Sequence, residues 1–146
     1  MQIARARGCS PVVGIAGGPE KCALVRGLGA DAMIDYKGED VAERIGELFP
    51  EGIDVYFDNV GGDILDAALA SINLKARIVL CGMISQYNQK KPAPGPYMLA
   101  NAISKRARLE GFIVFDYYDR AGEAVEDIVK WYSEGKITYR TDIVEG

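Results

Sequence analysis

Short runs of hydrophobic residues alternate along the chain with longer segments that carry hydrophobic side chains on one face only. Short, nearly all-apolar runs are typical of strands buried on both faces of a sheet, and the segments between them are typical of covering helices. The predicted strands are residues 11–16, 32–35, 54–60, 77–81 and 109–115.

Start and stop signals place helices between these strands. Pro19 is predicted as the first residue of a helix that runs to Leu28 and ends at Gly29. Asp40 and Asp63 are predicted to cap two further helices. The other helices are predicted over residues 2–7, about 98–106 and 123–133, the last with an inner face of Val125, Ile128, Val129 and Tyr132.

This alternation predicts an α/β protein with a doubly wound, Rossmann-type parallel sheet, because each helix crosses over one face of the sheet with right-handed geometry. Ligands of such sheets bind at the carboxyl ends of the strands, where the loops gather. The residues directly after each predicted strand are therefore the candidates for function.

Composition narrows the possible functions. The 146 residues carry a net charge of −4 with acids and bases interspersed, so no basic face indicates a nucleic-acid partner. The chain has no histidine and three cysteines without metal-ligand spacing, so we expect neither a zinc site nor a disulfide framework. No run is long enough to span a membrane and no signal peptide is evident, so we expect a cytoplasmic protein.

The turn after the first strand is a candidate phosphate site. Sheets that bind NAD usually carry an acid here for the ribose 2′-hydroxyl, whereas this chain has Gly17 and Gly18, which leave room for a 2′-phosphate. Lys21 lies in the first turn of the next helix, whose N-terminus favours anions, and Tyr36 follows the second strand. The alternative is an ordinary Gly-Gly turn beside a solvated lysine and a partly exposed tyrosine.

Two further loops carry polar groups. Asn59 follows the third strand beside glycines that allow close backbone approach, although a simple turn explains the same residues, and Asp58 is interpreted as a turn or capping acid. The long loop after the fourth strand is typical of a functional loop, while a lone cysteine such as Cys81 is more often a small buried residue. This loop begins with Cys81, Gly82, Met83, Ile84, Ser85, Gln86 and Tyr87, and the fifth strand ends with Phe112, Ile113 and Val114.

Taken in order, these segments resemble one family. The motifs are GIAGGPEK at 14–21, IDYK at 34–37, IDVYFDNVGG at 53–62, ARIVLCGMISQYN at 76–88 and KRARLEGFIVFDY at 105–117. They are similar to the NADP-dependent branch of the medium-chain dehydrogenase/reductases, which includes prostaglandin, alkenal/enone and curcumin reductases. The resemblance covers nearly the whole chain.

The resemblance implies hydride transfer from NADPH to the carbon–carbon double bond of an α,β-unsaturated ketone or aldehyde, without zinc. It implies that Gly17, Lys21 and Tyr36 adjoin the 2′-phosphate, and that Asn59 and residues 81–87 follow the ribose and pyrophosphate. It also implies that residues 112–114 hold the nicotinamide and that Tyr87 lies nearest the substrate, as the one candidate catalytic residue. A homodimer through the outer edge of the last strand is expected as well.

One departure from the family changes the expected architecture. In the family a strand and a glycine-rich turn precede the segment that residues 2–4 resemble, and here Met1 stands where a glycine is expected. We therefore expect residues 1–146 to be a truncated NADP-binding domain that lacks its first, central strand and is inactive by itself. Two alternatives remain: a non-catalytic nucleotide-binding or interaction module on the same fold, and a methyltransferase, against which the Gly17-Gly18 turn argues.

Overall fold

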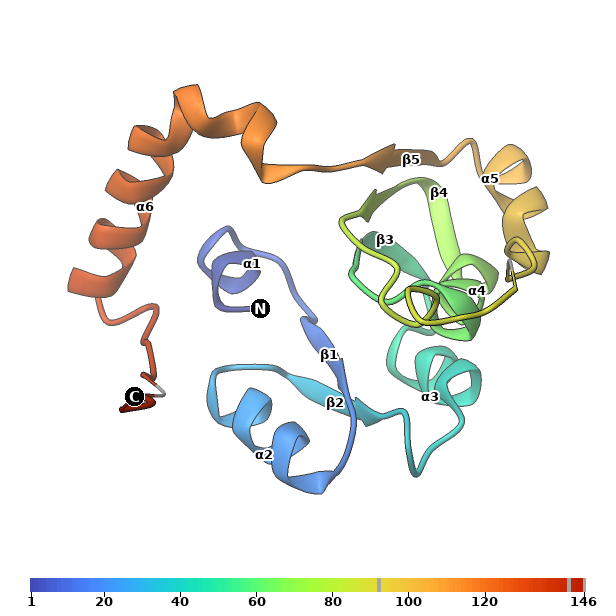
Figure 1. The fold of residues 1–146 in the computed structure, drawn as a ribbon, viewed down its shortest axis with the longest axis horizontal. Coiled ribbons are helices and arrows are strands. Elements are labelled where there is room, and N and C mark those ends of the chain that lie inside the picture. Colours follow the sequence, from blue (N-terminus) through green and yellow to red (C-terminus); the bar gives the residue numbers. More distant parts are fainter. Residues whose placement is uncertain (92, 142, 146) are drawn as a thin grey trace. The chain divides into compact units, whose positions relative to one another are not determined.

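The structure is a computed structural model that describes residues 1–91, 93–141 and 143–145. The chain forms two compact units, one made of Met1–Gly38 with Phe115–Gly146 and the other of Glu39–Val114. Each unit has its own parallel sheet (Figure 1). The units are therefore best understood one at a time.

The first unit is built on two parallel strands, which pair from Val13 with Ala32 to Ala16 with Asp35. Met33 and Ile34 of β2 are buried, as is Val12 directly before β1. The predicted second strand is confirmed at its predicted bounds, and Pro19 is the first residue of its helix as expected. The elements are α1 (Gln2–Ala6), β1 (Val13–Ala16), α2 (Pro19–Gly27), β2 (Ala32–Asp35), the 3₁₀ turn η2 (Val114–Arg120) and α6 (Ala121–Ser133).

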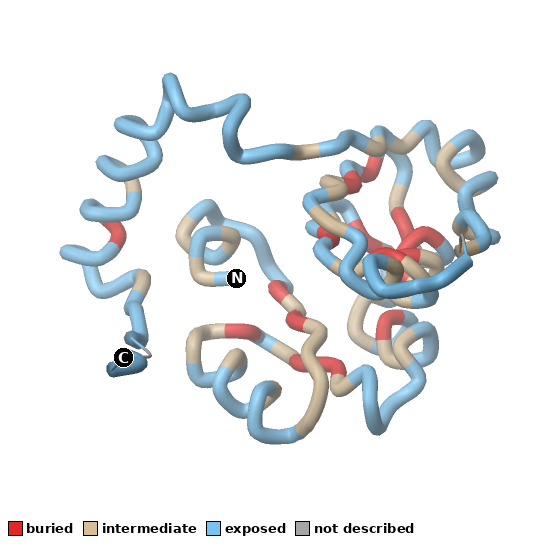
Figure 2. Tube along the Cα trace, viewed as in Figure 1, coloured by how far each residue is buried: buried red, intermediate tan, exposed pale blue. Residues whose placement is uncertain are grey.

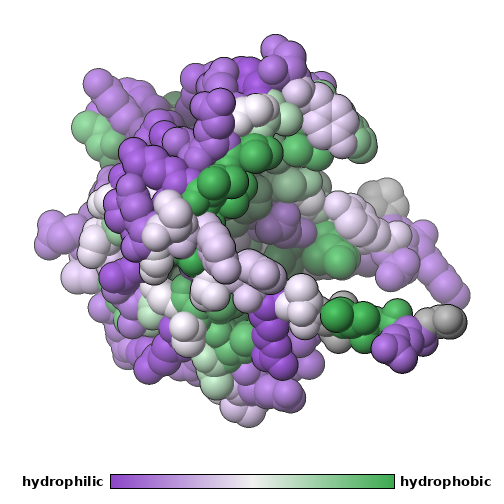
Figure 3. Space-filling view, turned by 90° about the vertical axis from the view of Figure 1, so that its left-hand side faces the viewer, coloured by the Kyte–Doolittle hydropathy of each residue, from purple (hydrophilic) through white to green (hydrophobic). Residues whose placement is uncertain are grey.

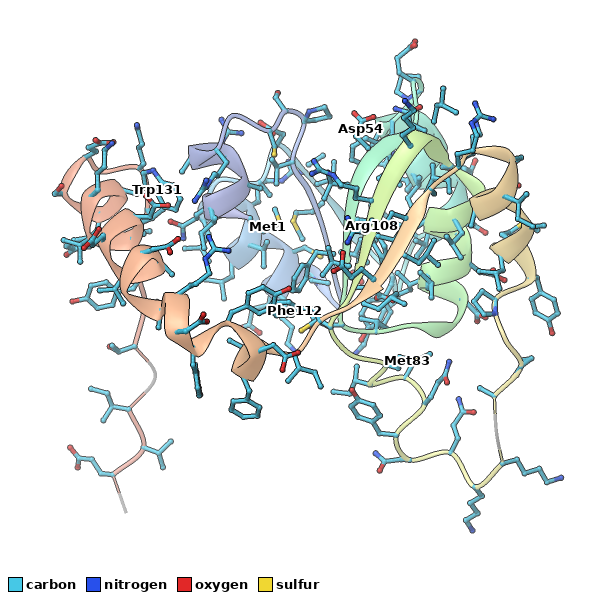
Figure 4. The ribbon with its side chains drawn as sticks, turned by 90° about the horizontal axis from the view of Figure 1, so that it is seen from above. Met1, Asp54, Met83, Arg108, Phe112 and Trp131 are labelled. Carbon is cyan, nitrogen blue, oxygen red and sulfur yellow. The ribbon has the colours of Figure 1, made fainter. Side chains whose placement is uncertain are left out.

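Helix α6 buries a different face from the predicted one. Trp131 is its buried residue, with the Arg7 guanidinium 5.2 Å from the ring centroid and an ion pair between Arg7 and Asp127 beside it. The guanidinium of Arg7, the residue directly after α1, thus covers an aromatic ring that the apolar periodicity did not single out. Figure 4 labels this residue, Trp131, on α6. The four residues predicted for the inner face are exposed instead, namely Val125, Ile128, Val129 and Tyr132.

The second unit holds three parallel strands in the order β3-β4-β5. The fourth predicted strand starts five residues earlier than expected, at Ile72 instead of residue 77, and the fifth ends at Gly111 instead of residue 115. The elements are α3 (Val41–Leu48), β3 (Ile53–Asp58), α4 (Gly62–Ala70), β4 (Ile72–Leu80), the 3₁₀ turn η1 (Tyr97–Leu99), α5 (Ala100–Ser104) and β5 (Arg108–Gly111).

Helix α4 covers one face of this second sheet. Leu65 and Leu69 of the helix form a buried cluster with Ile72, Ala76 and Ile78 of β4 (Figure 2). Burying each leucine or isoleucine side chain of this cluster stabilises the unit by about 1.5–3 kcal/mol. The core therefore fixes where the loops at the carboxyl ends of β3 and β4 begin.

The helix starts in this unit confirm one predicted cap and correct another. The Asp40 carboxylate accepts the Glu43 N–H at 2.9 Å, as a side-chain cap does. Asp63 does not cap α4, because the capping position is held by Gly61 and Asp63 already lies in the first turn. An acid in that turn still interacts favourably with the positive end of the helix dipole.

Parallel strands with flanking helices confirm the predicted α/β fold class. Within the described residues, one edge of β1 and one edge of β3 have no strand partner. The central strand expected between them stays a prediction. No helix in the described ranges is both long enough and apolar enough to cross a membrane.

Candidate functional site

The candidate residues lie at the carboxyl ends of the strands, in two groups. Gly17, Lys21 and Tyr36 belong to the first unit. Asn59, residues 81–87 and residues 112–114 belong to the second unit. Figure 4 shows Phe112 and Arg108 at opposite ends of the β5 segment, so Phe112 is on the carboxyl side.

Gly17 and Tyr36 are brought together by the pairing of β1 with β2. A Cβ atom added at Gly17 would lie 2.7 Å from the Tyr36 hydroxyl oxygen and ring, so the tyrosine occupies the space that the missing side chain leaves. The Tyr36 N–H donates to the Ala16 carbonyl at 3.1 Å, which holds the main chain of Tyr36 against the end of β1. The side chain remains about half exposed, at 47%.

Helix α2 begins at this turn without a side-chain cap. Gly18 is its capping residue, with φ 94°, a conformation that favours glycine. Lys21 lies in the first turn and is exposed, and no described residue forms an ion pair with it. Open amides, the positive end of the helix dipole and a lysine together suit an anion.

Asp35 is a carboxylate at this turn that sequence reasoning missed. One of its oxygens accepts the Gly18 N–H at 2.8 Å and the Lys37 N–H at 3.0 Å. These two backbone hydrogen bonds lower the pKa of Asp35, the bond from Gly18 most strongly. The cross-strand pairing of Ala16 with Asp35 brings the acid to the turn, a signal that a single strand's sequence does not carry.

The Asp35 interaction predicts an acid-sensitive first unit. Because its folded-state pKa lies below the unfolded value, the ionised carboxylate stabilises the fold above about pH 4, and this stabilisation is lost as the pH falls through the folded-state pKa. Asp35→Asn should therefore lower the urea midpoint near neutral pH, and the difference from wild type should shrink as the pH falls below about 4. A difference that stays constant with pH would contradict this role.

The loops after β3 and β4 are joined by backbone hydrogen bonds. The Ile84 N–H donates to the Asn59 carbonyl, and the Ser85 N–H donates to the Val60 carbonyl, each at 3.1 Å. The Ser85 hydroxyl donates to the same Val60 carbonyl at 2.5 Å. Asn59 in the loop after β3 and residues 81–85 in the loop after β4 therefore form one continuous surface.

Tyr87 folds back on its own loop. Its hydroxyl oxygen accepts the Met83 N–H at 3.0 Å, and a Cβ at Gly82 would lie 3.0 Å from that oxygen. Because the bond uses a lone pair, the hydroxyl hydrogen remains available for donation. The ring is 67% exposed. Met83, Ser85 and Gln86 also line a cavity of about 270 Å³ against α4 and residues 93–97.

Phe112 extends the pairing of β5 with β4, since its N–H donates to the Leu80 carbonyl at 3.0 Å. Its ring meets Phe57 of β3 edge-on, with centroids 6.3 Å apart. Ile113 and Val114 follow as exposed apolar side chains. On the face drawn in Figure 3, hydrophobic side chains likewise reach the surface.

The structure settles two minor interpretations in these loops. Asp58 is a turn acid as predicted, because its carboxylate accepts the N–H groups of Val60 and Gly61. The view of Cys81 as a buried residue is wrong, because it lies exposed just beyond β4. Phe57 was missed, although its place near the end of a strand that leads into a candidate loop was a usable signal.

The described part of the chain contains no group of three or more His, Cys, Asp or Glu side chains placed to hold a metal ion. What the geometry does offer is an uncapped helix start beside a lysine, and two joined loops edged by exposed apolar side chains. The helix start in the first unit suits a phosphate group, and the apolar edge of the loops in the second unit suits a planar ring.

Parallel strands with ligand-type loops at their carboxyl ends define an α/β protein of the nucleotide-binding kind. The chain belongs to the zinc-binding dehydrogenase family, whose sequence pattern it matches over residues 1–133. The predicted resemblance to the reductase branch is confirmed by individual relatives.

The chain is 42% identical to the NADPH-dependent curcumin reductase of Escherichia coli, over 99% of this chain and 44% of that protein. It is 44% identical to the NADP-dependent 2-alkenal reductase of Nicotiana tabacum, over 99% of this chain and 42% of that protein. The crystal structure of CurA in complex with NADPH from Vibrio vulnificus superposes with a TM-score of 0.90 at 45% identity, over 99% of this chain and 44% of that one. The chain thus spans less than half the length of these relatives.

Proposed function

We propose that this chain is the NADP(H)-binding part of a zinc-independent reductase that acts on the carbon–carbon double bond of α,β-unsaturated ketones or aldehydes. The observation that carries the proposal is its similarity, over nearly its whole length, to a protein solved with NADPH. The similarity to curcumin and alkenal reductases supports the substrate class.

The first unit fits the adenosine end of the cofactor. Lys21 in the first turn of α2 and the Tyr36 hydroxyl above Gly17 are groups that bind a 2′-phosphate by charge and by hydrogen bonding. The Asp35 carboxylate at the same turn is already bonded to two backbone N–H groups. We assign Gly17, Lys21 and Tyr36 to the phosphate.

The second unit fits the rest of the cofactor. Asn59 offers a side-chain amide beside the joined loops, and residues 81–87 present an exposed edge. The exposed side chains of Ile113 and Val114, with Phe112 half-buried beside them, form an apolar surface for a planar nicotinamide ring. We assign these residues to the ribose, pyrophosphate and nicotinamide.

When bound, NADPH supplies a hydride to the β-carbon of the enone. The chain's contribution is to hold a proton donor for the oxygen on which negative charge develops. Tyr87 suits this role, because its hydroxyl oxygen is held by the Met83 N–H while its hydrogen remains free. No step in this scheme requires a metal ion.

The proposal is tested on the protein that carries this chain by calorimetric titration with NADPH and NADH, followed by turnover with an enone. We expect tighter binding of NADPH and a saturated ketone as product. Binding without turnover would favour a non-catalytic nucleotide-binding module. Failure to bind either cofactor would contradict the assignment.

Replacing Gly17 tests the phosphate turn. In Gly17→Ala the new methyl group would overlap the Tyr36 ring, which is flexible at its far end and would move away. Losing one hydrogen bond should raise the Kd for NADPH about three- to tenfold, with little change for NADH. The comparison is made by titration, and in a Tyr36→Phe background the same substitution should have a smaller effect.

We also propose a homodimer through the outer edge of β5. The Phe112 N–H donates toward β4, so by strand alternation the N–H of Gly111, the last residue of β5, faces the open edge. An open edge readily pairs with a second copy of the same strand. Gly111→Pro removes this donor and should convert the dimer to a monomer in sedimentation velocity; an unchanged dimer would exclude this edge.

A cytoplasmic location completes the proposal. No disulfide joins Cys9, Cys22 and Cys81 within the described residues, which suits a reducing compartment. The proposed partners are the small-molecule enone or enal and a second copy of the protein, without nucleic acid or membrane.

A further inference from the structure

Asp58 differs in its burial from every other polar side chain in the described residues. It is fully buried, at 0% exposure, and is the one buried polar or charged residue among them. It lies at the end of β3, the strand whose Tyr56 packs against the apolar cluster beneath α4. Burying a carboxylate is costly unless its oxygens are bonded, and both oxygens of Asp58 accept hydrogen bonds.

The Asp58 side chain organises the loop after β3. One carboxylate oxygen accepts the Val60 N–H at 2.9 Å and the Gly61 N–H at 3.1 Å, and the other accepts Gly61 at 3.1 Å. The Tyr56 hydroxyl donates to the same carboxylate at 3.3 Å. Burial raises the pKa of Tyr56, with the Asp58 charge adding to the shift, so this hydroxyl stays protonated and remains a donor.

The main chain of the same residue organises the loop after β4. The Asp58 carbonyl accepts the Cys81 N–H at 2.8 Å and the Gly82 N–H at 3.1 Å. The bonds from Ile84 and Ser85 to the neighbouring carbonyls of Asn59 and Val60 continue this connection. Asp58 is therefore the residue from which both loops are held.

The carboxylate fixes a conformation that the loop would not otherwise keep. Gly61 has φ 68°, a left-handed conformation, and α4 starts directly after it without any side-chain cap. Without the carboxylate, the buried Gly61 N–H and the half-buried Val60 N–H would lose their acceptor, and the turn would be free to relax. Movement of the turn would carry Asn59 and the carbonyls that hold residues 84 and 85.

We propose that Asp58 is a positioning residue that locks the loops after β3 and β4 into one frame, and that this frame sets the geometry with which Asn59 and residues 81–87 meet the cofactor. The inference rests on the proposed NADP(H) function for its second half only. The frame itself is a property of the hydrogen bonds within the second unit.

The test uses Asp58→Asn in the protein that carries this chain. Asparagine keeps the size of the side chain and one acceptor oxygen but loses the charge and the second acceptor. Amide hydrogen exchange without cofactor should become about tenfold faster in segments 60–61 and 81–85, while β4 residues of the core keep their protection. The Kd for NADPH should rise about tenfold in parallel.

Leu69→Ala is the matched control for lost stability. Leu69 is fully buried under the same sheet and takes no part in the two loops through its side chain. It should lower the urea midpoint at least as much as Asp58→Asn does, because large-to-small core substitutions are strongly destabilising. Its loop exchange relative to the core and its NADPH affinity should nevertheless remain near the wild-type values.

Each outcome decides one part of the proposal. Wild-type loop protection in Asp58→Asn, or equal loss of NADPH affinity in Leu69→Ala, would overturn the positioning role while leaving the proposed function intact. Absence of NADPH binding by the wild-type protein would overturn the proposed function and the cofactor half of this inference. The positioning role of Asp58 is supported if Asp58→Asn shows both faster exchange in the two loops and weaker NADPH binding, and Leu69→Ala shows neither.

Discussion

Tyr87→Phe in the protein that carries this chain is expected to lower kcat for enone reduction about a hundredfold, because a donor to the developing oxyanion is removed. The Tyr87 hydroxyl is suited to donate, since its oxygen accepts the Met83 N–H at 3.0 Å and its hydrogen stays free. The Kd for NADPH should change much less than kcat. Steady-state kinetics and a separate cofactor titration measure the two quantities.

Tyr139→Phe is the control for Tyr87, because Tyr139 is an exposed tyrosine at 71% and lies in the first unit. Its kinetics should match wild type. If Tyr87→Phe instead raises the Kd for NADPH and leaves kcat unchanged, Tyr87 holds its loop through Met83 and does not serve the substrate.

Lys21→Ala is expected to reduce the preference of the protein for NADPH over NADH. Loss of a charge-assisted contact to the 2′-phosphate costs about 1.5–3 kcal/mol, which raises the Kd for NADPH about tenfold or more. NADH has no such phosphate, so its Kd should remain nearly unchanged. Parallel titrations with the two cofactors give the ratio directly.

Arg26→Ala is the control that distinguishes a specific contact between Lys21 and the 2′-phosphate from the general electrostatic effect of a positive charge on α2. Arg26 lies in the last turn of the same helix and is exposed, so its removal changes the net charge equally. It should leave the ratio of the two Kd values unchanged. If Lys21→Ala raised the Kd values for NADPH and NADH equally, Lys21 would not be a contact to the 2′-phosphate.

Local signals in the sequence predicted the elements whose ends depend on neighbouring residues. Pro19 at a helix start and Asp40 as a cap are set within a few residues, and both are confirmed. The early start of β4 at Ile72 depends on a partner strand, since Ile72 pairs with Ile53. The residues around Ile72 therefore carry no local pattern that predicts this start. The buried face of α6 likewise depends on Arg7, more than a hundred residues earlier in the chain.

The candidate loops could be predicted from the sequence, but their connections could not. The rule that ligands meet the carboxyl ends of parallel strands is enough to single out Asn59 and Cys81. The bonds that join these loops are between backbone atoms, which every residue has, so no residue type marks them. Asp35 escaped notice for a similar reason, because it reaches the turn after β1 from the neighbouring strand.

Isotope transfer tests the central claim most directly. The protein that carries this chain is incubated with NADPH deuterated at the transferable position and with an α,β-unsaturated ketone, and the product is analysed by mass spectrometry and NMR. We predict a saturated ketone with one deuterium on the former β-carbon, formed equally in the presence of a metal chelator. Deuterium on a carbinol carbon, which marks reduction of the carbonyl to an alcohol, would contradict the account.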